Sequence, residues 1–275
     1  MYKKVILKAY NEKYAIPQFN FDDLEMAKFI LEECERLKSP VFLAVSEGAI
    51  KYMGGLKVVT NLVRGLLIDL KITVPVILHL DHGKNINLCK QAIDYGFCSV
   101  MLDLSYKDLE ENIKEVKKIV KYDKKVMVEC EVGSIGKKGN EGINYASKED
   151  CIKMMNETNA YLLAPAIGTV HGLYKGKQNI NIELLKEINE SIKKPLVLHG
   201  GSDTNEEIIK ECIENGISKI NINTNLKQAW TKGVIQYINS NKNEYDYRKF
   251  ITNAEKYIKK VVEEKIKLFG SENKA

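Results

Sequence analysis

Residues 195–224 read PLVLHGGSDTNEEIIKECIENGISKININT and contain one complete strand–helix–strand repeat. The apolar run Pro195–Gly201 predicts a buried strand, and Lys219–Thr224 predicts the next one. Between them, Glu206–Glu214 has a helical pattern that Asn215 and Gly216 end, as they often end helices. Because a helix joins the two strands, we expect them to be parallel neighbours in one sheet.

The same alternation runs along most of the chain, with helical patterns such as Asp22–Lys38, Lys107–Lys121 and Ile182–Ser191 between apolar runs. The eight predicted strands are Ala15–Asn20, Val41–Ser46, Val74–His82, Ser99–Ser105, Lys125–Gly133, Tyr161–Thr169, Pro195–Gly201 and Lys219–Thr224. Eight repeats favour a closed (β/α)8 TIM barrel as a single domain over residues 1–275. An open doubly wound sheet is the alternative, and the nucleotide-binding forms of it lack their glycine motifs here. The amphipathic tail Tyr245–Ala275 predicts extra C-terminal helices packed outside the barrel.

Composition excludes several classes of protein. Of 275 residues, 44% are hydrophobic and 29% charged, which excludes a disordered chain, a collagen-like fibre and a small disulfide scaffold. No apolar run approaches the ~20 residues of a membrane-spanning helix, and a net charge of +5 is too small to favour nucleic acid. Six cysteines without CxxC spacing indicate buried thiols in a reducing compartment. We expect a cytoplasmic protein that binds neither membranes nor nucleic acids.

Three of the four histidines, His82, His171 and His199, precede a glycine at or just past the end of a predicted strand. The carboxyl ends of barrel strands form the active-site rim, so these imidazoles can converge there. Three neutral imidazoles with an open fourth position are typical of catalytic zinc. The alternative is that each is an ordinary residue at a strand end, as we interpret His79 to be a structural one within its strand.

Other polar residues lie at the same predicted rim. Asp81, Asp103 and Glu131 end predicted strands, which indicates a polar pocket, although pairing with lysines is an alternative. The glycines Gly172, Gly200 and Gly201 would let backbone N–H groups approach an anion. Side-chain donors near them are Ser202, Asn223 and Thr224. Loops after the seventh and eighth strands are the usual phosphate site of this barrel.

Nine ordered segments carry a resemblance to a known family: YAIPQFNFDDLE, PVFLAVSEGAIKYMGG, VPVILHLDHG, VMLDLS, VECEVGSIG, YLLAPAIGTVHGLYKG, KPLVLHGGSD, KININ and YDYRKF…KLFGS. Together they resemble the class II (zinc-dependent) fructose-bisphosphate and tagatose-bisphosphate aldolases over almost the whole chain. The resemblance implies that His82, His171 and His199 hold a catalytic Zn²⁺. It implies that Asp81 transfers the proton at the C4 hydroxyl of a ketose. Asp103 and Glu131 match an alternative or second divalent-metal position.

The resemblance also implies how a sugar phosphate is held. Dihydroxyacetone phosphate, with a monovalent cation (Na⁺ or K⁺) nearby, would be bound by Gly172, Gly200, Gly201, Ser202, Asn221, Asn223 and Thr224. Ser46 matches a pocket serine. Arg248 matches an arginine that reaches the distal phosphate in a neighbouring subunit, which implies a homodimer or homotetramer.

Two segments depart from the family pattern. After VECEVGSIG, Lys137 and Lys138 stand where glycine is expected, and Glu141 is the only acid left in the loop. We predict Glu141 as the base that exchanges the proton of the ketone substrate. Asn225 stands where relatives tend to carry an acid.

Since a metal would polarise the carbonyl, no Schiff-base lysine is needed, and we expect no distinctive lysine buried on a strand.

The sequence thus predicts a zinc-dependent aldolase that cleaves a ketose 1,6-bisphosphate, fructose 1,6-bisphosphate first, into dihydroxyacetone phosphate and glyceraldehyde 3-phosphate. The alternatives are an aldolase for tagatose bisphosphate or another ketose phosphate, and a non-catalytic barrel that binds metal. A metal-dependent hydrolase or isomerase is a third alternative. Barrel hydrolases usually carry an HxH pair on the first strand, and AIPQFN contains no histidine.

Overall fold

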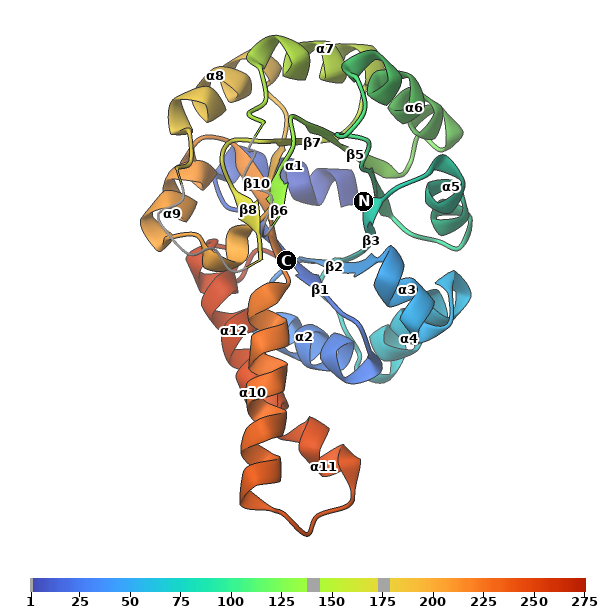
Figure 1. The fold of residues 1–275 in the computed structure, drawn as a ribbon, viewed down its shortest axis with the longest axis vertical. Coiled ribbons are helices and arrows are strands. Elements are labelled where there is room, and N and C mark those ends of the chain that lie inside the picture. The colour runs from blue at the N-terminus through green and yellow to red at the C-terminus, as the bar shows by residue number, and fades with distance from the viewer. Residues whose placement is uncertain (1, 138–143, 173–178) are drawn as a thin grey trace.

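Parallel strands close into the barrel that the eight repeats predict (Figure 1), in a computed structural model that describes residues 2–137, 144–172 and 179–275. The barrel strands are β1 (Ile16–Asn20), β2 (Val41–Ser46), β3 (Val76–Gly83), β4 (Ser99–Leu102), β5 (Met127–Val132), β7 (Leu162–Pro165), β9 (Leu196–Leu198) and β10 (Ile217–Ile222). Their order around the barrel follows the chain, and β10 pairs with β1 to close it. The predicted (β/α)8 barrel is confirmed.

Helices cover the outside of the strands and pack their apolar faces onto them. They are α2 (Leu24–Arg36), α3 (Glu47–Met53), α4 (Leu56–Asp69), α5 (Ile86–Asp94), α6 (Leu109–Tyr122), α7 (Lys148–Thr158), α8 (Ile182–Ile192), α9 (Glu206–Glu214), α10 (Thr224–Ser240) and α12 (Glu255–Leu268). The short helix α11 (Tyr247–Thr252) has no buried residue and packs against α10 instead. Asp23 caps α2 by accepting a hydrogen bond from the Met26 N–H at 2.8 Å.

Among the described residues, no helix has the length and apolar character needed to cross a membrane.

One predicted strand differs from the structure. The strand predicted over Tyr161–Thr169 ends at Pro165, and Val170–His171 forms a separate strand, β8, that pairs with β6 (Gly136–Lys137) outside the barrel sheet. Three residues after β7, Gly168 takes φ +110°, a left-handed conformation that turns the chain before β8 begins. The predicted C-terminal helices are confirmed as α11 and α12, which are separated at Asn253–Ala254.

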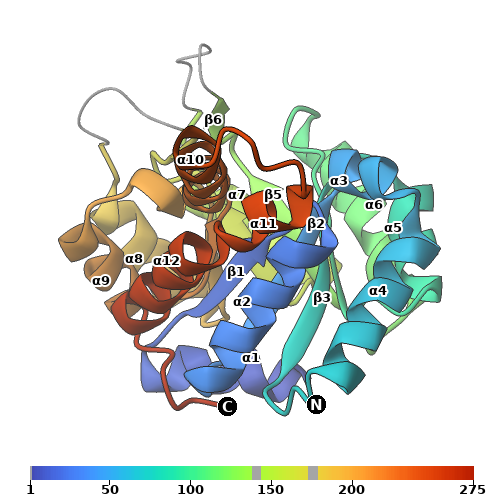
Figure 2. The same ribbon diagram turned by 90° about the horizontal axis from the view of Figure 1, so that it is seen from below.

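An additional helix, α1 (Tyr2–Glu12), closes the amino-terminal end of the barrel (Figure 2). Its buried residues Ile6 and Ala9 belong to one apolar cluster with inward side chains from the lower half of the barrel. The barrel members of this cluster are Ile16, Phe42, Ile77, Met127, Leu162, Ala164 and Val197. The base of the barrel is therefore a packed hydrophobic core.

The upper half of the interior is polar. Side chains two residues apart on a strand share a face, so the strands that place Phe42, Ile77 and Met127 below also direct the residues two and four positions later inward and upward. The buried polar residues on this face are Gln18, Asn20, His79, Asp81, Glu129, Glu131, His199, Lys219 and Asn221. The carboxyl end of the barrel is thus lined by buried polar and charged side chains, whereas its base is apolar.

At the amino-terminal end, Glu35 near the end of α2 ties this helix to the segment that enters β3. Its carboxylate accepts hydrogen bonds from the Thr73 N–H at 2.7 Å and the Val74 N–H at 3.1 Å, and it pairs with Lys38. Burial opposes ionisation of Glu35, but Lys38 and Thr73 outweigh it and lower the pKa of this carboxyl to about 2.

Glu35→Gln is expected to lower the free energy of unfolding at pH 7 by about 1–2 kcal/mol, because hydrogen bonds to a charged acceptor are lost. A carboxyl with a depressed pKa stabilises the fold above its ordinary pKa of 4.5 and loses this contribution as the pH falls toward 2. Denaturant titrations at pH 7 and pH 2 should show the difference between variant and wild type shrinking. The control is Glu190→Gln, at an exposed position on α8. A difference that stays constant down to pH 2 would contradict this role.

Candidate active site at the carboxyl end of the barrel

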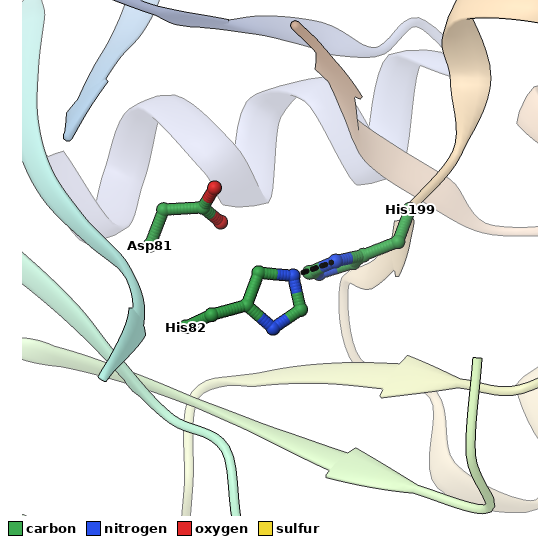
Figure 3. A group of neighbouring side chains, drawn as sticks. All are labelled: Asp81, His82 and His199. Atoms are coloured by element: carbon green, nitrogen blue, oxygen red, sulfur yellow. Dashed lines mark hydrogen bonds between the residues drawn. The ribbon is translucent and has the colours of Figure 1, made fainter. Parts of the chain in front are cut away.

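Two histidines from opposite sides of the barrel meet at its carboxyl end. His82 ends β3, and His199 directly follows β9, which lies across the barrel from β3. Their rings pack edge to face with centroids 4.7 Å apart, and His82 Nε2 lies 3.0 Å from His199 Nδ1. Figure 3 shows the Asp81 carboxylate directed toward the same point. Of the three imidazoles that the sequence analysis expects to converge, the described structure brings these two together.

An irregularity in β3 allows Asp81 and His82 to share this point. Neighbouring residues of a regular strand face opposite sides, but the pairing of β3 with β4 shifts between Leu80 and Gly83, and His82 has φ +51°. A histidine in the left-handed region is strained by about 1–2 kcal/mol. Gly83 is required next to it because a Cβ there would lie 2.8 Å from the Met101 carbonyl oxygen. Because of this strained bulge, the consecutive side chains of Asp81 and His82 both face the same site.

Each imidazole is held by a carboxylate on its outer nitrogen. His82 Nδ1 lies 2.8 Å from Asp103 Oδ2, and His199 Nε2 lies 2.8 Å from Glu129 Oε1. An ionised carboxylate only accepts hydrogen bonds, so both outer nitrogens donate. The lone pair of each neutral ring is therefore on the inner nitrogen, where the two rings face each other.

The charges around the two rings favour a positive charge where these lone pairs meet. Burial opposes protonation of His82, but Asp81 and Asp103 raise the pKa of its imidazole to about 9. Burial lowers the pKa of His199, so this ring is the neutral acceptor. Burial also disfavours the charge on Asp81, but the nearby imidazoles of His82 and His199 outweigh it and hold the pKa of this carboxyl below its usual range. The site is thus arranged around a positive charge.

These residues fit a divalent metal ion. One ligand atom each from Asp81, His82 and His199 lie within 4.8 Å of one another. Two nitrogens on a tetrahedral zinc with bonds of about 2.0–2.1 Å would be about 3.3–3.4 Å apart, close to the observed 3.0 Å. The metal would replace the proton shared by the two rings.

Asp81 is fixed by two amides. Asn20 Nδ2 donates to its Oδ2 at 2.8 Å, and Asn221 Nδ2 lies 3.4 Å from its Oδ1. Ser46 lies beside Asp81 on the neighbouring strand β2, where it caps α3 by accepting from the Ala49 N–H at 3.2 Å. Asn221 and Ser46 are among the predicted site residues, whereas Asn20 was missed.

A second group of possible ligands is formed by His82, Asp103 and Glu131. Burial and the charge of Asp103 raise the pKa of Glu131 to about 7. Its Oε2 is buried and has no hydrogen-bond partner among the described residues. An orphaned buried oxygen is costly and fits a position that a cation would complete. In this structure Asp103 also bonds His82 and Ser105, the latter at 2.8 Å.

The predicted phosphate loop comes together beside these groups. Gly200, with φ +71°, leads into a 3₁₀ turn at Gly201–Asp203, and the Asn223 N–H lies 3.4 Å from Ser202 Oγ. Asn223 precedes α10, whose first residue is Thr224. A Cβ on Gly201 would lie 2.5 Å from Ile220 Cγ2, so only glycine fits between the turn and β10. Asn223 does not cap this long helix with its side chain, so the first N–H groups of α10 suit an anion.

Four predicted residues are not placed at this site by the described structure. The backbone of His171 lies on β8, but its side chain is outside the described part of the chain, as is all of Glu141. Gly172 follows β8 with φ +91°. Arg248 lies on α11, at the end of an arm that α10 extends away from the barrel (Figure 1). Its side chain is 77% exposed and pairs with Asp246 at 2.8 Å.

Two charged residues inside the barrel were missed, and one expectation was wrong. Lys219 is a fully buried lysine on β10, contrary to the expectation that no strand would carry one. Its Nζ donates to Glu129 Oε2 at 2.8 Å, and Glu129 is buried as completely. Period-two spacing was the available signal, because Glu129 precedes Glu131 by two residues and Lys219 precedes Asn221 by two. His79, interpreted as structural, is buried and hydrogen-bonded to Ser99 at 2.8 Å.

Comparison with known proteins gives one consistent result. The family model described as "Fructose-bisphosphate aldolase class-II" matches residues 1–274. A fructose-bisphosphate aldolase of Staphylococcus aureus is 42% identical over 279 aligned positions, covering 99% of this chain and 98% of that protein. One from Geobacillus stearothermophilus is 43% identical, covering 99% and 97%.

Solved structures agree with the sequence relatives. The YdjI aldolase of Escherichia coli K12 is 31% identical with a TM-score of 0.87, covering 99% of this chain and 97% of that one. The fructose-bisphosphate aldolase of Campylobacter jejuni is 26% identical with a TM-score of 0.87, covering 100% and 95%. The family model matches the whole chain, and the barrel and the paired histidines agree with it. This protein therefore belongs to the class II fructose-bisphosphate aldolase family.

Proposed function

We propose that this protein reversibly cleaves a ketose 1,6-bisphosphate, fructose 1,6-bisphosphate first, into dihydroxyacetone phosphate and glyceraldehyde 3-phosphate. The observation that carries this is the pair of inward imidazole nitrogens of His82 and His199 beside the Asp81 carboxylate. Its family is metal-dependent and acts on sugar phosphates. Tagatose 1,6-bisphosphate differs from fructose 1,6-bisphosphate in stereochemistry at one carbon. The assay below distinguishes the two as substrates.

Zinc is the metal we propose, held by His82, His199 and His171. Imidazole nitrogens in a tetrahedral set suit this ion, and a bound Zn²⁺ would supply Lewis-acid polarisation of the ketone carbonyl. Asp103 and Glu131 would serve a second divalent position, which the unpartnered Glu131 oxygen supports.

Asp81 is the proposed proton carrier at the C4 hydroxyl. Its depressed pKa keeps it ionised near neutral pH, so it accepts the hydroxyl proton as the carbon–carbon bond breaks and returns it in the condensation direction. The amides of Asn20 and Asn221 hold its oxygens in place. From the sequence, Glu141 is proposed to exchange the proton on dihydroxyacetone phosphate.

The phosphate of dihydroxyacetone phosphate is proposed to lie against the loop between β9 and α10. The residues that would bind it are Gly172, Gly200, Gly201, Ser202, Asn221, Asn223 and Thr224, with Ser46 in the pocket. A monovalent cation, Na⁺ or K⁺, would lie nearby. The buried Asn223 Oδ1, which has no partner among the described residues, is an acceptor suited to it.

We further propose a homodimer or homotetramer in which the arm formed by α10 and α11 reaches a neighbouring subunit. The arm exposes large apolar side chains, including Ile235, Tyr245 (90% exposed) and Tyr247. Contiguous exposed apolar residues mark interaction surfaces. A cytoplasmic location is supported by the cysteines, all six of which are free thiols.

The zinc-loaded protein is expected to cleave fructose 1,6-bisphosphate in an assay that detects triose phosphate. Dialysis against a chelator should abolish cleavage, and added zinc should restore it, because the carbonyl is no longer polarised without the metal. Tagatose 1,6-bisphosphate and ketose monophosphates belong in the same panel, and faster turnover of one of them would reassign the substrate. Full activity after chelation, or no turnover of any ketose phosphate with zinc bound, would contradict the proposed function.

Asp81→Asn is expected to retain zinc but to lower kcat by about 10²–10⁴-fold, because the proton carrier is lost. Zinc content and turnover are measured on the same sample, with Asp69→Asn, at an exposed position on α4, as the control. Loss of zinc from the variant would make Asp81 a metal ligand instead. Wild-type turnover would remove it from the mechanism.

Arg248→Ala and Asp81→Asn are expected to complement each other when the two subunits are co-expressed. If Arg248 acts across a dimer interface, each mixed dimer contains one intact site, and random mixing gives about a quarter of wild-type activity. Subunits carrying different tags allow the mixed species to be purified and assayed. Activity no higher than that of the separate variants would place Arg248 outside the partner's site.

A further inference from the structure

The most completely buried charges of the described residues lie directly below the site, on β5 and β10. Lys219 and Glu129 are both 0% exposed and are joined at 2.8 Å. The lysine also donates to Asn221 Oδ1 at 3.0 Å, and its Nζ lies 5.3 Å from the centre of the Phe42 ring. Replacing a buried ion pair by apolar residues is often neutral or stabilising. Stability alone therefore does not account for this pair.

An ammonium group can only donate hydrogen bonds, so Lys219 fixes the direction of every bond around it. With one Glu129 oxygen bound to the lysine, the other accepts from His199 Nε2 at 2.8 Å. That bond places the hydrogen of His199 on Nε2 and leaves Nδ1 directed toward His82. The first branch from Lys219 thus orients a proposed metal ligand.

The second branch runs through Asn221 to Asp81. Because the Asn221 carbonyl oxygen faces Lys219, its amide nitrogen faces Asp81 Oδ1 at 3.4 Å. A flipped amide would direct N–H groups at the ammonium and a carbonyl oxygen at the carboxylate, and both contacts are repulsive. Lys219 therefore sets which end of Asn221 meets the proposed proton carrier.

We propose that Lys219 is a positioning residue that orients His199 through Glu129 and Asp81 through Asn221. This inference rests on the proposed function for its catalytic part, but not for its metal-binding part. Lys219 acts as an orienting cation and not as a nucleophile, since its ammonium is engaged by Glu129 and Asn221. One buried lysine thus orders both halves of the site.

Lys219→Met, which keeps the length of the side chain but removes its donors, tests the proposal. Zinc affinity, measured by competition with a chromophoric chelator without substrate, should weaken by about 10–100-fold. Turnover per bound zinc should also fall at saturating substrate, with KM changing less than kcat. The matched control is Ser218→Ala, the neighbouring fully buried residue of β10, whose hydroxyl bonds only the Gly216 carbonyl oxygen among the contacts described. It should leave both measurements unchanged.

A double variant, Lys219→Met with Glu129→Gln, keeps the test decisive if the single variant leaves an unpaired carboxylate that prevents folding. Its glutamine carbonyl can still accept from His199, so zinc affinity should recover, whereas Asn221 stays free to flip and kcat stays low. Wild-type zinc affinity together with wild-type kcat in either folded variant would overturn the proposal. An inactive wild type would refute the proposed function alone, since the zinc measurement needs no turnover.

Discussion

The 3.0 Å approach of His82 Nε2 to His199 Nδ1 is the contact on which the carboxyl end of the barrel depends. It brings two lone pairs together, an arrangement that is stable only when a proton or a metal ion lies between them. The surrounding carboxylates of Asp103 and Glu129 supply the matching negative charge and hold each ring by its outer nitrogen. The need for a cation at this point explains why several charged side chains are buried at this end of the barrel.

Along the strands of the barrel, apolar side chains pack at the base and polar side chains lie at the carboxyl end. Phe42, Ile77 and Met127 pack at the base, and residues further along the same strands carry the polar groups. The polar end contains a strained residue, because His82 holds a left-handed backbone within β3. Such strain persists only when rigid surroundings impose it, and the apolar base supplies that rigidity.

Most of the fold could be predicted from the sequence, because apolar runs and helical patterns alternate eight times. The break between β7 and β8 could not, since the turn at Gly168 lies within an apolar run that looks continuous. The meeting of His82 and His199 was predictable from their places at strand ends. Glu129 and Lys219 were not recognised, because a single charge in a strand looks the same whether it faces solvent or a partner across the barrel. Only the closed barrel reveals that the two side chains face each other.

The helix that closes the base has a consequence for how the chain reaches its native state. Ile6 of α1 packs in one cluster with Leu162 and Val197, so α1 finds its contacts only with strands that lie more than half the chain away in sequence. Contacts so distant in sequence slow folding and leave apolar surface uncovered in the meantime. Until β7 and β9 have formed, the apolar face of α1 has nothing to pack against, and it stays open to aggregation.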